Sequence, residues 1–185
     1  MQYRFALSAL LACTLAAALP ASAQDLKPGL WEVNNDVSSS SPQAQAAISE
    51  VQRHLATMSP EQRQSMQQML ERNGIQLNIG AGGALQTRMC MTREMIERRE
   101  FPVQQGNCTQ NITPTGGNRL KVAFSCTKPR ASGEGEMTVE SPTRYRARMQ
   151  VRSDERNETV DMDVNGRWVA ADCGRVKPVA VPKGK

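Results

Sequence analysis

The C-terminal stretch of the chain, residues 135–173, decides the fold: GEMTVESPTRYRARMQVRSDERNETVDMDVNGRWVAADC. Apolar and polar side chains alternate along most of this stretch, which is the period of strands that bury one face and expose the other. Short groups of turn-forming residues interrupt the alternation. The stretch therefore predicts an antiparallel meander of four strands.

The first hairpin of this meander turns at residues 141–143 and sets basic side chains against acidic or polar ones. Its predicted register is Glu140 opposite Arg144, Thr138 opposite Arg146 and Glu136 opposite Arg148. A slip of one residue would turn these charges toward the core, so this register is strongly favoured.

The second hairpin continues the pattern with apolar pairs on one face and a charged pair on the other. Its predicted register is Val151 opposite Val160, Met149 opposite Met162, Ala147 opposite Val164 and Arg148 opposite Asp163. Beyond it, Asn165 and Gly166 predict a type I′ turn that joins Val164 to Arg167.

The segment 144–152 carries four arginines: Arg144, Arg146, Arg148 and Arg152. A nucleic-acid site would leave such arginines unpaired and would add aromatic side chains for stacking. Here acidic residues face several of them on the neighbouring strands, and only 4% of all residues are aromatic. We therefore expect a solvated sheet face and no nucleic-acid partner.

The N-terminus has the features of a cleaved secretory signal peptide over residues 1–23. Arg4 precedes an apolar run at 5–19, and Ala21-Ser22-Ala23 supplies a cleavage site before Gln24. The run is shorter than the ~20 apolar residues that a transmembrane helix needs. We expect a periplasmic protein, with a membrane-anchored lipoprotein at Cys13 as the alternative.

The mature chain is expected to form one β-rich domain over residues 24–177, with a helical insertion at 42–73 and a flexible tail at 178–185. Ser59 and Gln62 form a capping box at the second helix of the insertion. Thr92 caps a short helix that ends near Arg99. Loss of Arg4 takes the basic count from 23 to 22 against 18 acidic residues, and this small excess identifies no partner.

These signals predict an α+β fold. Its main element is a twisted antiparallel sheet of about seven or eight strands. The helical insertion and a short helix at 92–99 complete it. The pattern leaves open whether the sheet closes into a barrel.

Four cysteines remain once Cys13 has left with the signal peptide: Cys90, Cys108, Cys126 and Cys173. An even number in an exported chain predicts two disulfides, whereas structural zinc would require closely spaced pairs. A hairpin that turns near Gly116 and Gly117 brings Cys108 within one residue of Cys126, and a small bulge would set them opposite each other. We therefore predict the pairs Cys108–Cys126 and Cys90–Cys173.

The sequence contains no recognisable catalytic constellation. His54 is the only histidine, which argues against a catalytic triad and excludes a histidine-rich zinc site. Met66 with Met69, and Met89 with Met91, could donate thioethers to copper(I), although methionine more often fills gaps in a core. We expect no enzyme activity, no metal and no cofactor, with an unrecognised envelope hydrolase or a copper binder as the alternatives.

Several landmarks follow one another along the mature chain. They are LKPGLWEV at 26–33, CMTREM at 90–95, the cysteines at 108 and 126, and a closing GRW…DCG at 166–174. In this order they resemble the exported bacterial proteins of domain-of-unknown-function family 3617. The resemblance implies a β-rich envelope protein and supplies neither catalytic residues nor an activity.

The apolar face of the meander suggests a function. Most of its side chains are small or flexible: Met137, Val139, Tyr145, Ala147, Met149, Val151, Val160, Met162, Val164 and Val169. Such a lining either packs beneath the helical insertion or leaves room for an elongated apolar guest.

We therefore hypothesise a non-enzymatic binding module for an apolar or lipid-like ligand. The residues proposed to bind this ligand are Met137, Val139, Tyr145, Met149 and Met162. An envelope protein is the other kind of partner that we expect.

Overall fold

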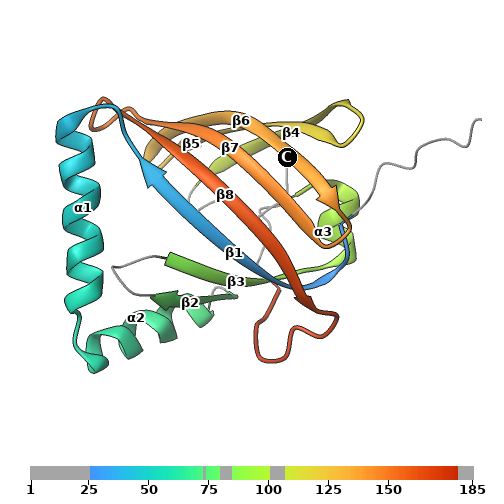
Figure 1. Cartoon of the computed structure of the whole chain (residues 1–185), viewed down its shortest axis with the longest axis horizontal. Helices are drawn as coiled ribbons and strands as arrows, with labels where there is room; N and C mark the ends of the chain where they lie inside the picture. Colours follow the sequence, from blue (N-terminus) through green and yellow to red (C-terminus); the bar gives the residue numbers. More distant parts are fainter. Residues whose placement is uncertain (1–25, 73, 80–84, 101–106, 179–185) are drawn as a thin grey trace, which may run out of the picture.

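The structure is a computed structural model that describes residues 26–72, 74–79, 85–100 and 107–178 (Figure 1). Its strands are β1 (Gly29–Ser38), β2 (Ile75–Ile79), β3 (Leu85–Met91), β4 (Cys108–Gly116), β5 (Arg119–Thr127), β6 (Arg130–Ser141), β7 (Arg144–Ser153) and β8 (Glu158–Ala170). Its helices are α1 (Pro42–Thr57), α2 (Pro60–Arg72) and α3 (Arg93–Arg98). The predicted signal peptide, the alternative anchor at Cys13 and residues 179–185 of the predicted tail lie outside the described residues.

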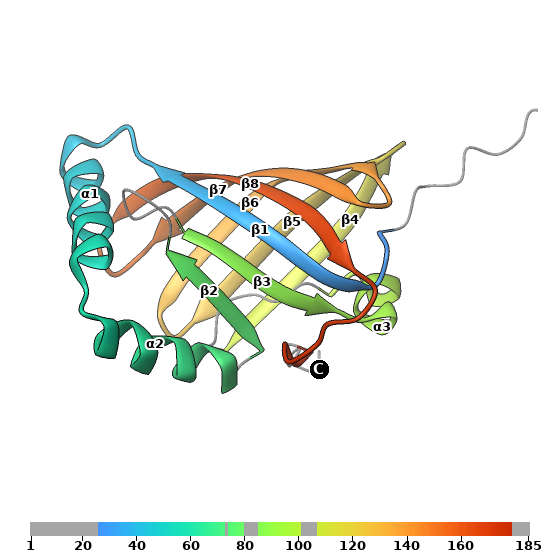
Figure 2. The same cartoon turned by 60° about the horizontal axis from the view of Figure 1, so that its bottom comes forward.

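The strands form one antiparallel sheet of eight strands in the order β2-β3-β1-β8-β7-β6-β5-β4. Figures 1 and 2 show that this sheet curls toward a barrel, with β2 and β4 at its two edges. The edge strands do not pair with each other, so the barrel is not closed. The predicted α+β fold, an antiparallel sheet with a helical insertion and a short helix, is confirmed.

Strand β2 has no counterpart among the predicted strands. It has 5 residues and begins directly after the end of α2, which is too short a stretch for a clear periodic signal. Pairing with β3 defines it, with Ile75 opposite Met89 and Leu77 opposite Thr87.

Side-chain caps define the starts of the helices as the sequence predicts. At α2 the Gln62 N–H donates to Ser59 Oγ at 3.3 Å, and the Ser59 N–H donates to Gln62 Oε1 at 2.9 Å, which completes the capping box. At α3 the Met95 N–H donates to Thr92 Oγ1 at 3.2 Å. Local sequence is therefore sufficient to place these two helix starts.

The helical insertion stands at one end of the sheet and does not form a second layer over it. In Figure 1, α1 lies across the end at which β1 finishes and β8 begins, and the Ser39 hydroxyl donates to the Thr159 carbonyl there at 2.8 Å. Ala44 is the buried residue of α1, and α2 has no buried residue. No helix in the described ranges is long and apolar enough to cross a membrane.

The two predicted hairpins between β6, β7 and β8 have the predicted register, with one exception. Their cross-strand pairs include Thr138–Arg146, Glu136–Arg148, Met149–Met162, Val151–Val160, Ala147–Val164 and Arg148–Asp163. The exception is Glu140: a bulge between Val139 and Ser141 places Ser141 opposite Arg144. Glu140 forms an ion pair with Arg146 instead.

The predicted turn at Asn165 and Gly166 is wrong. Strand β8 runs through both residues without interruption, and Gly166 pairs with Val33 on one side and Tyr145 on the other. A Cβ at position 166 would overlap the ring of Tyr145. This glycine therefore makes room for an aromatic ring on a neighbouring strand and does not serve a left-handed turn.

The uninterrupted strand also corrects one residue of the predicted apolar face. Successive side chains of a strand point to opposite faces. Trp168 therefore follows Gly166 on the apolar face, where it packs against the core. Val169 comes next, at the register shift between β8 and β1, and is not among the described residues that pack in or against the core. The predicted turn would have placed Val169 on the apolar face.

Both predicted cysteine pairs are joined, Cys108 to Cys126 and Cys90 to Cys173. Cys108 lies directly opposite Cys126, since the β4–β5 hairpin contains a register shift between Pro114 and Gly116. The second bridge ties the end of β3 to the segment after β8. Together the two bridges fasten both sides of the curled sheet.

Replacement of Gly166 by alanine should lower the free energy of unfolding by about 2–3 kcal/mol, because the added methyl group and the Tyr145 ring would occupy one space. Asn165→Ala is the matched control: Asn165 is exposed, and its loss should cost less than about 0.5 kcal/mol. Chemical denaturation measures both. Equal losses would indicate that the two residues act together as a turn.

Candidate ligand-binding face

The five residues predicted to bind a ligand lie on one face of adjacent strands. Val139 of β6 is opposite Tyr145 of β7, and Met149 of β7 is opposite Met162 of β8. Met137 is opposite Ala147 on the same face. We call this face, which carries the buried side chains, the inner face of the sheet, and we call the face that carries Arg144 and Arg146 the outer face.

One end of the inner face is sealed by large side chains. Trp31 is completely buried, Met91 is 1% exposed, and Leu26, Val33 and Met137 are also part of this core. Met95 of α3 is buried as well. These buried residues fill the end of the inner face near α3.

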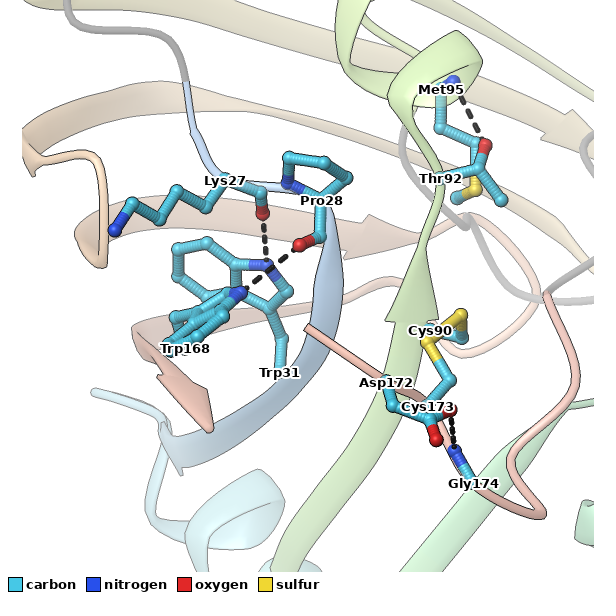
Figure 3. The surroundings of a disulfide bond; sticks show 10 residues. All are labelled: Lys27, Pro28, Trp31, Cys90, Thr92, Met95, Trp168, Asp172, Cys173 and Gly174. Atoms are coloured by element: carbon cyan, nitrogen blue, oxygen red, sulfur yellow. Dashed lines mark hydrogen bonds between the residues drawn. A yellow bond between two sulfur atoms is a disulfide. The ribbon is translucent and has the colours of Figure 1, made fainter. Parts of the chain in front are cut away.

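Hydrogen bonds from two indoles fix the sealed end in place (Figure 3). Trp31 Nε1 donates to the Lys27 carbonyl at 2.9 Å, and Trp168 Nε1 donates to the Pro28 carbonyl at 3.1 Å. The segment that enters β1 is thereby fastened to both rings. A buried indole N–H needs such a partner, and these carbonyls provide it.

Tyr145 lies at the inner limit of this core and has an unusual hydroxyl group. Its ring centroid is 5.4 Å from that of Trp31, and its ring covers Gly166. The hydroxyl makes no hydrogen bond within the described chain. Every fully buried polar side-chain atom of the described residues does have a hydrogen-bond partner. The Tyr145 hydroxyl therefore borders accessible space, while the residue as a whole is 8% exposed.

Burial raises the pKa of Tyr145 well above its ordinary value of 10.0. A buried phenol favours its neutral form because the phenolate would lose hydration. At physiological pH the hydroxyl is therefore a neutral group that can donate one hydrogen bond and accept others.

The half of the inner face toward α1 is open by comparison. Its apolar side chains are only half-buried: Val37, Phe124, Met149, Val151, Val160 and Met162. No residue of α2 and only Ala44 of α1 is buried. Solvent therefore reaches an apolar surface that, in a closed core, would be fully covered.

The outer face carries a buried carboxylate that sequence reasoning missed. Glu32 of β1 is 6% exposed and lies between Arg88 of β3 and Arg167 of β8. Arg88 donates to Glu32 Oε2 at 3.0 and 3.2 Å, and Arg167 donates to Oε1 at 2.6 Å. Both oxygens are thus held by guanidinium groups from two different strands.

These contacts alter the acidity of Glu32. The hydrogen bond from Arg167, assisted by Arg88, lowers the pKa of Glu32 below its ordinary value of 4.5, against the opposing effect of burial. A clue was present in the sequence, since Glu32 interrupts the apolar residues Trp31 and Val33. Its partners are 56 and 135 residues away, and only the strand order reveals them.

Two hollows lie on the surface of the described chain. One of about 770 Å³ is open and is lined mainly by outer-face residues, among them Lys121, Glu134 and Asp163, and also by Met149 and Met162. Another of about 540 Å³ lies along α2 and is lined by Met58, Gln62, Ser65, Met66, Met69 and Arg72. Neither has the enclosed apolar walls typical of a small-molecule site.

The residues weighed for other chemistries are scattered. Met89 and Met91 pack in or against the core of the sheet, whereas Met66 and Met69 lie on α2. His54 is exposed on α1. Within the described ranges, no group of three or more histidine, cysteine or acidic residues is placed to hold a metal ion.

The fold and its two faces define a disulfide-linked, incompletely closed antiparallel β-barrel with an apolar interior. The chain belongs to the family described as "Protein of unknown function (DUF3617)", which matches residues 26–173 and confirms the resemblance seen in the sequence. It is also similar to an "Uncharacterized protein in lpd-3 5'region" of Pseudomonas putida. The two are 34% identical over 118 residues, which cover 63% of this chain and 78% of that protein.

Replacement of Glu32 by glutamine should lower the free energy of unfolding by about 1–3 kcal/mol, because it removes the charge that both guanidinium groups share. Glu136→Gln is the matched control: Glu136 is an exposed acid of the outer face with no ion pair in the described chain, and its change should cost less than about 0.5 kcal/mol. Denaturant titration at neutral pH measures both. Similar losses in the two variants would contradict a special role for Glu32.

The lowered pKa of Glu32 also predicts that the stability of the fold depends on pH. Because the pKa of Glu32 is lower in the folded chain than its ordinary 4.5, its ionised form stabilises the fold above that pH. This stabilisation is lost as the pH falls below 4.5 and through the folded pKa. The difference in stability between wild type and Glu32→Gln should shrink over this range; a difference that stays constant would contradict the assignment.

Proposed function

We propose that this protein is an exported, non-enzymatic binding module that holds an elongated apolar ligand against the inner face of its sheet. The observation that carries the proposal is the contrast between the two ends of that face. The end near α3 is filled by Trp31, Met91 and Tyr145, whereas Met149 and Met162 toward α1 are half-buried. A ligand would cover the half that the chain itself leaves partly open.

The dimensions of the face suit an elongated guest. Six residue steps along β7 separate Tyr145 from Val151, which corresponds to about 20 Å of strand. The side chains along this path are small or unbranched, and methionine adapts to different apolar shapes. The ligand class that fits best is therefore a single acyl or prenyl chain.

Tyr145 supplies a polar group at the end of this path that lies against the buried core. Its neutral hydroxyl borders accessible space and has no partner within the described chain. Ligand sites typically combine apolar walls with a few polar groups that fix orientation. We assign the Tyr145 hydroxyl to a carbonyl or similar acceptor on the ligand.

The two disulfides favour an oxidising compartment outside the cytoplasm. Periplasmic export through cleavage before Gln24 fits this setting and remains part of the proposal. A ligand carrier is useful in that compartment because apolar chains must cross water between membranes.

Saturable binding of 1-N-phenylnaphthylamine, with competition by palmitate, tests the proposed site. Met149→Trp fills the half-buried part of the inner face and should weaken binding about tenfold. Gln150→Trp places the same side chain one residue along β7 on the exposed outer face and should leave affinity unchanged. Fluorescence titration measures both.

The fold must remain intact for this comparison, so thermal unfolding of each variant serves as its control. Equal affinities of Met149→Trp and Gln150→Trp would place the probe elsewhere. If the wild type shows no saturable binding and palmitate does not raise its melting temperature, the apolar-ligand proposal is wrong.

Tyr145→Phe isolates the polar group. The hydroxyl makes no hydrogen bond in the described chain, so its removal should change the free energy of unfolding by less than about 1 kcal/mol. Binding of decylubiquinone, which carries carbonyl acceptors, should weaken about three- to tenfold. Binding of 1-N-phenylnaphthylamine, which carries no carbonyl, should not change, and an equal loss for both probes would contradict the assigned contact.

A further inference from the structure

Arg144 differs from the other arginines of its strand. Arg146 pairs with Glu140, Arg148 with Asp163 at 3.0 Å, and Arg152 with Asp154 at 3.6 Å. Arg144 is exposed and has no ion pair or side-chain hydrogen bond in the described part of the chain. The charge complementarity of the outer face thus ends at this residue.

Another arginine lies directly opposite Arg144. It is Arg167 of β8, and like charges in this arrangement destabilise a sheet. Neighbouring strands are about 4.8 Å apart, so both guanidinium groups can contact the same anionic group of a ligand. The pair is a local cost to the fold that an anion between the two side chains would offset.

Glu32 orients one member of this pair, Arg167, without neutralising both arginines. Arg167 donates one N–H to Glu32 Oε1 at 2.6 Å, and Arg88 occupies Oε2 from the other side. The carboxylate is 7% exposed, whereas Arg167 is 57% exposed. The fixed guanidinium of Arg167 therefore keeps further donors directed to solvent. Arg88, Glu32, Arg167 and Arg144 are cross-strand neighbours in one row over β3, β1, β8 and β7, so this row holds three arginines and one acid.

We propose that Arg144 and Arg167 form a binding site for a phosphate group on the outer face, with Glu32 and Arg88 holding Arg167 in position. Guanidinium groups present paired donors that match the oxygens of phosphate. The shared chemistry is that of a phosphate mono- or diester, from a soluble ligand or from a phospholipid headgroup. The site lies on the outer face of the sheet, whereas Tyr145 lies on the inner face. It is therefore independent of the proposed apolar site.

Nuclear magnetic resonance of the arginine Nε–H groups tests this site in the disulfide-bonded protein. Inorganic phosphate is titrated against sodium chloride at matched ionic strength, and sedimentation with phosphatidylglycerol or phosphatidylcholine vesicles forms a second arm. Arg144→Gln should weaken binding about tenfold without lowering the melting temperature, because it also relieves a like-charge contact. Arg146→Gln is the control, two residues along the same exposed face, and should leave binding unchanged.

Two outcomes support the proposal. Saturable shifts at Arg144 and Arg167 with inorganic phosphate assign a soluble phosphate ligand. Binding that depends on Arg144 only with phosphatidylglycerol vesicles assigns a lipid headgroup. The proposal is overturned if Arg144→Gln binds as well as wild type in both arms, or if Arg146→Gln loses as much as Arg144→Gln, which indicates general attraction to positive charge.

Discussion

Two successive residues of β1 hold the sheet together from both sides. Trp31 is completely buried and closes the interior, whereas Glu32 points to the other face and joins β3 to β8 through Arg88 and Arg167. Strands β3 and β8 belong to distant parts of the sequence, and β1 lies between them. This pair adds to the other links between the N-terminal strands and the C-terminal meander, which include the Cys90–Cys173 disulfide and the hydrogen bond from Trp168 to Pro28.

The arrangement also explains why an acid is tolerated in so buried a position. Removing a carboxylate from water is costly unless its oxygens find charged partners. Here each oxygen has one guanidinium donor, and those guanidinium groups remain partly solvated. The guanidinium donors therefore replace most of the hydration that Glu32 loses on burial. Its charge favours the strands that carry Arg88 and Arg167 as the neighbours of β1.

Local rules were sufficient for much of this fold, and long-range contacts account for the errors. Alternation and charge pairing predicted the register from Glu136 to Val160 except at Glu140, where a bulge intervenes. Capping chemistry predicted the helix start at Ser59. Asn165 and Gly166 carry the local signature of a turn, but the ring of Tyr145 on the next strand requires a glycine at that place. Neither β2 nor the partners of Glu32 could be predicted, because a short strand and a three-strand contact are defined only once the strand order is known.

For the candidate binding residues, too, local pattern predicts the face and long-range contacts decide the burial. Alternation placed Met137, Val139, Tyr145, Met149 and Met162 on one face, but it carries no information about which end of that face is filled. The degree of filling follows from Trp31 and Met91, which enter from the other half of the chain, and from a helical insertion in which only Ala44 is buried among the described residues. The meander supplies an apolar surface, β1 and β3 seal one end of it, and the helices stand beside the part that stays open. Because α1 and α2 contribute so little to the buried core, the part of the inner face toward α1 is not covered as the sealed end is, although both ends belong to the same strands.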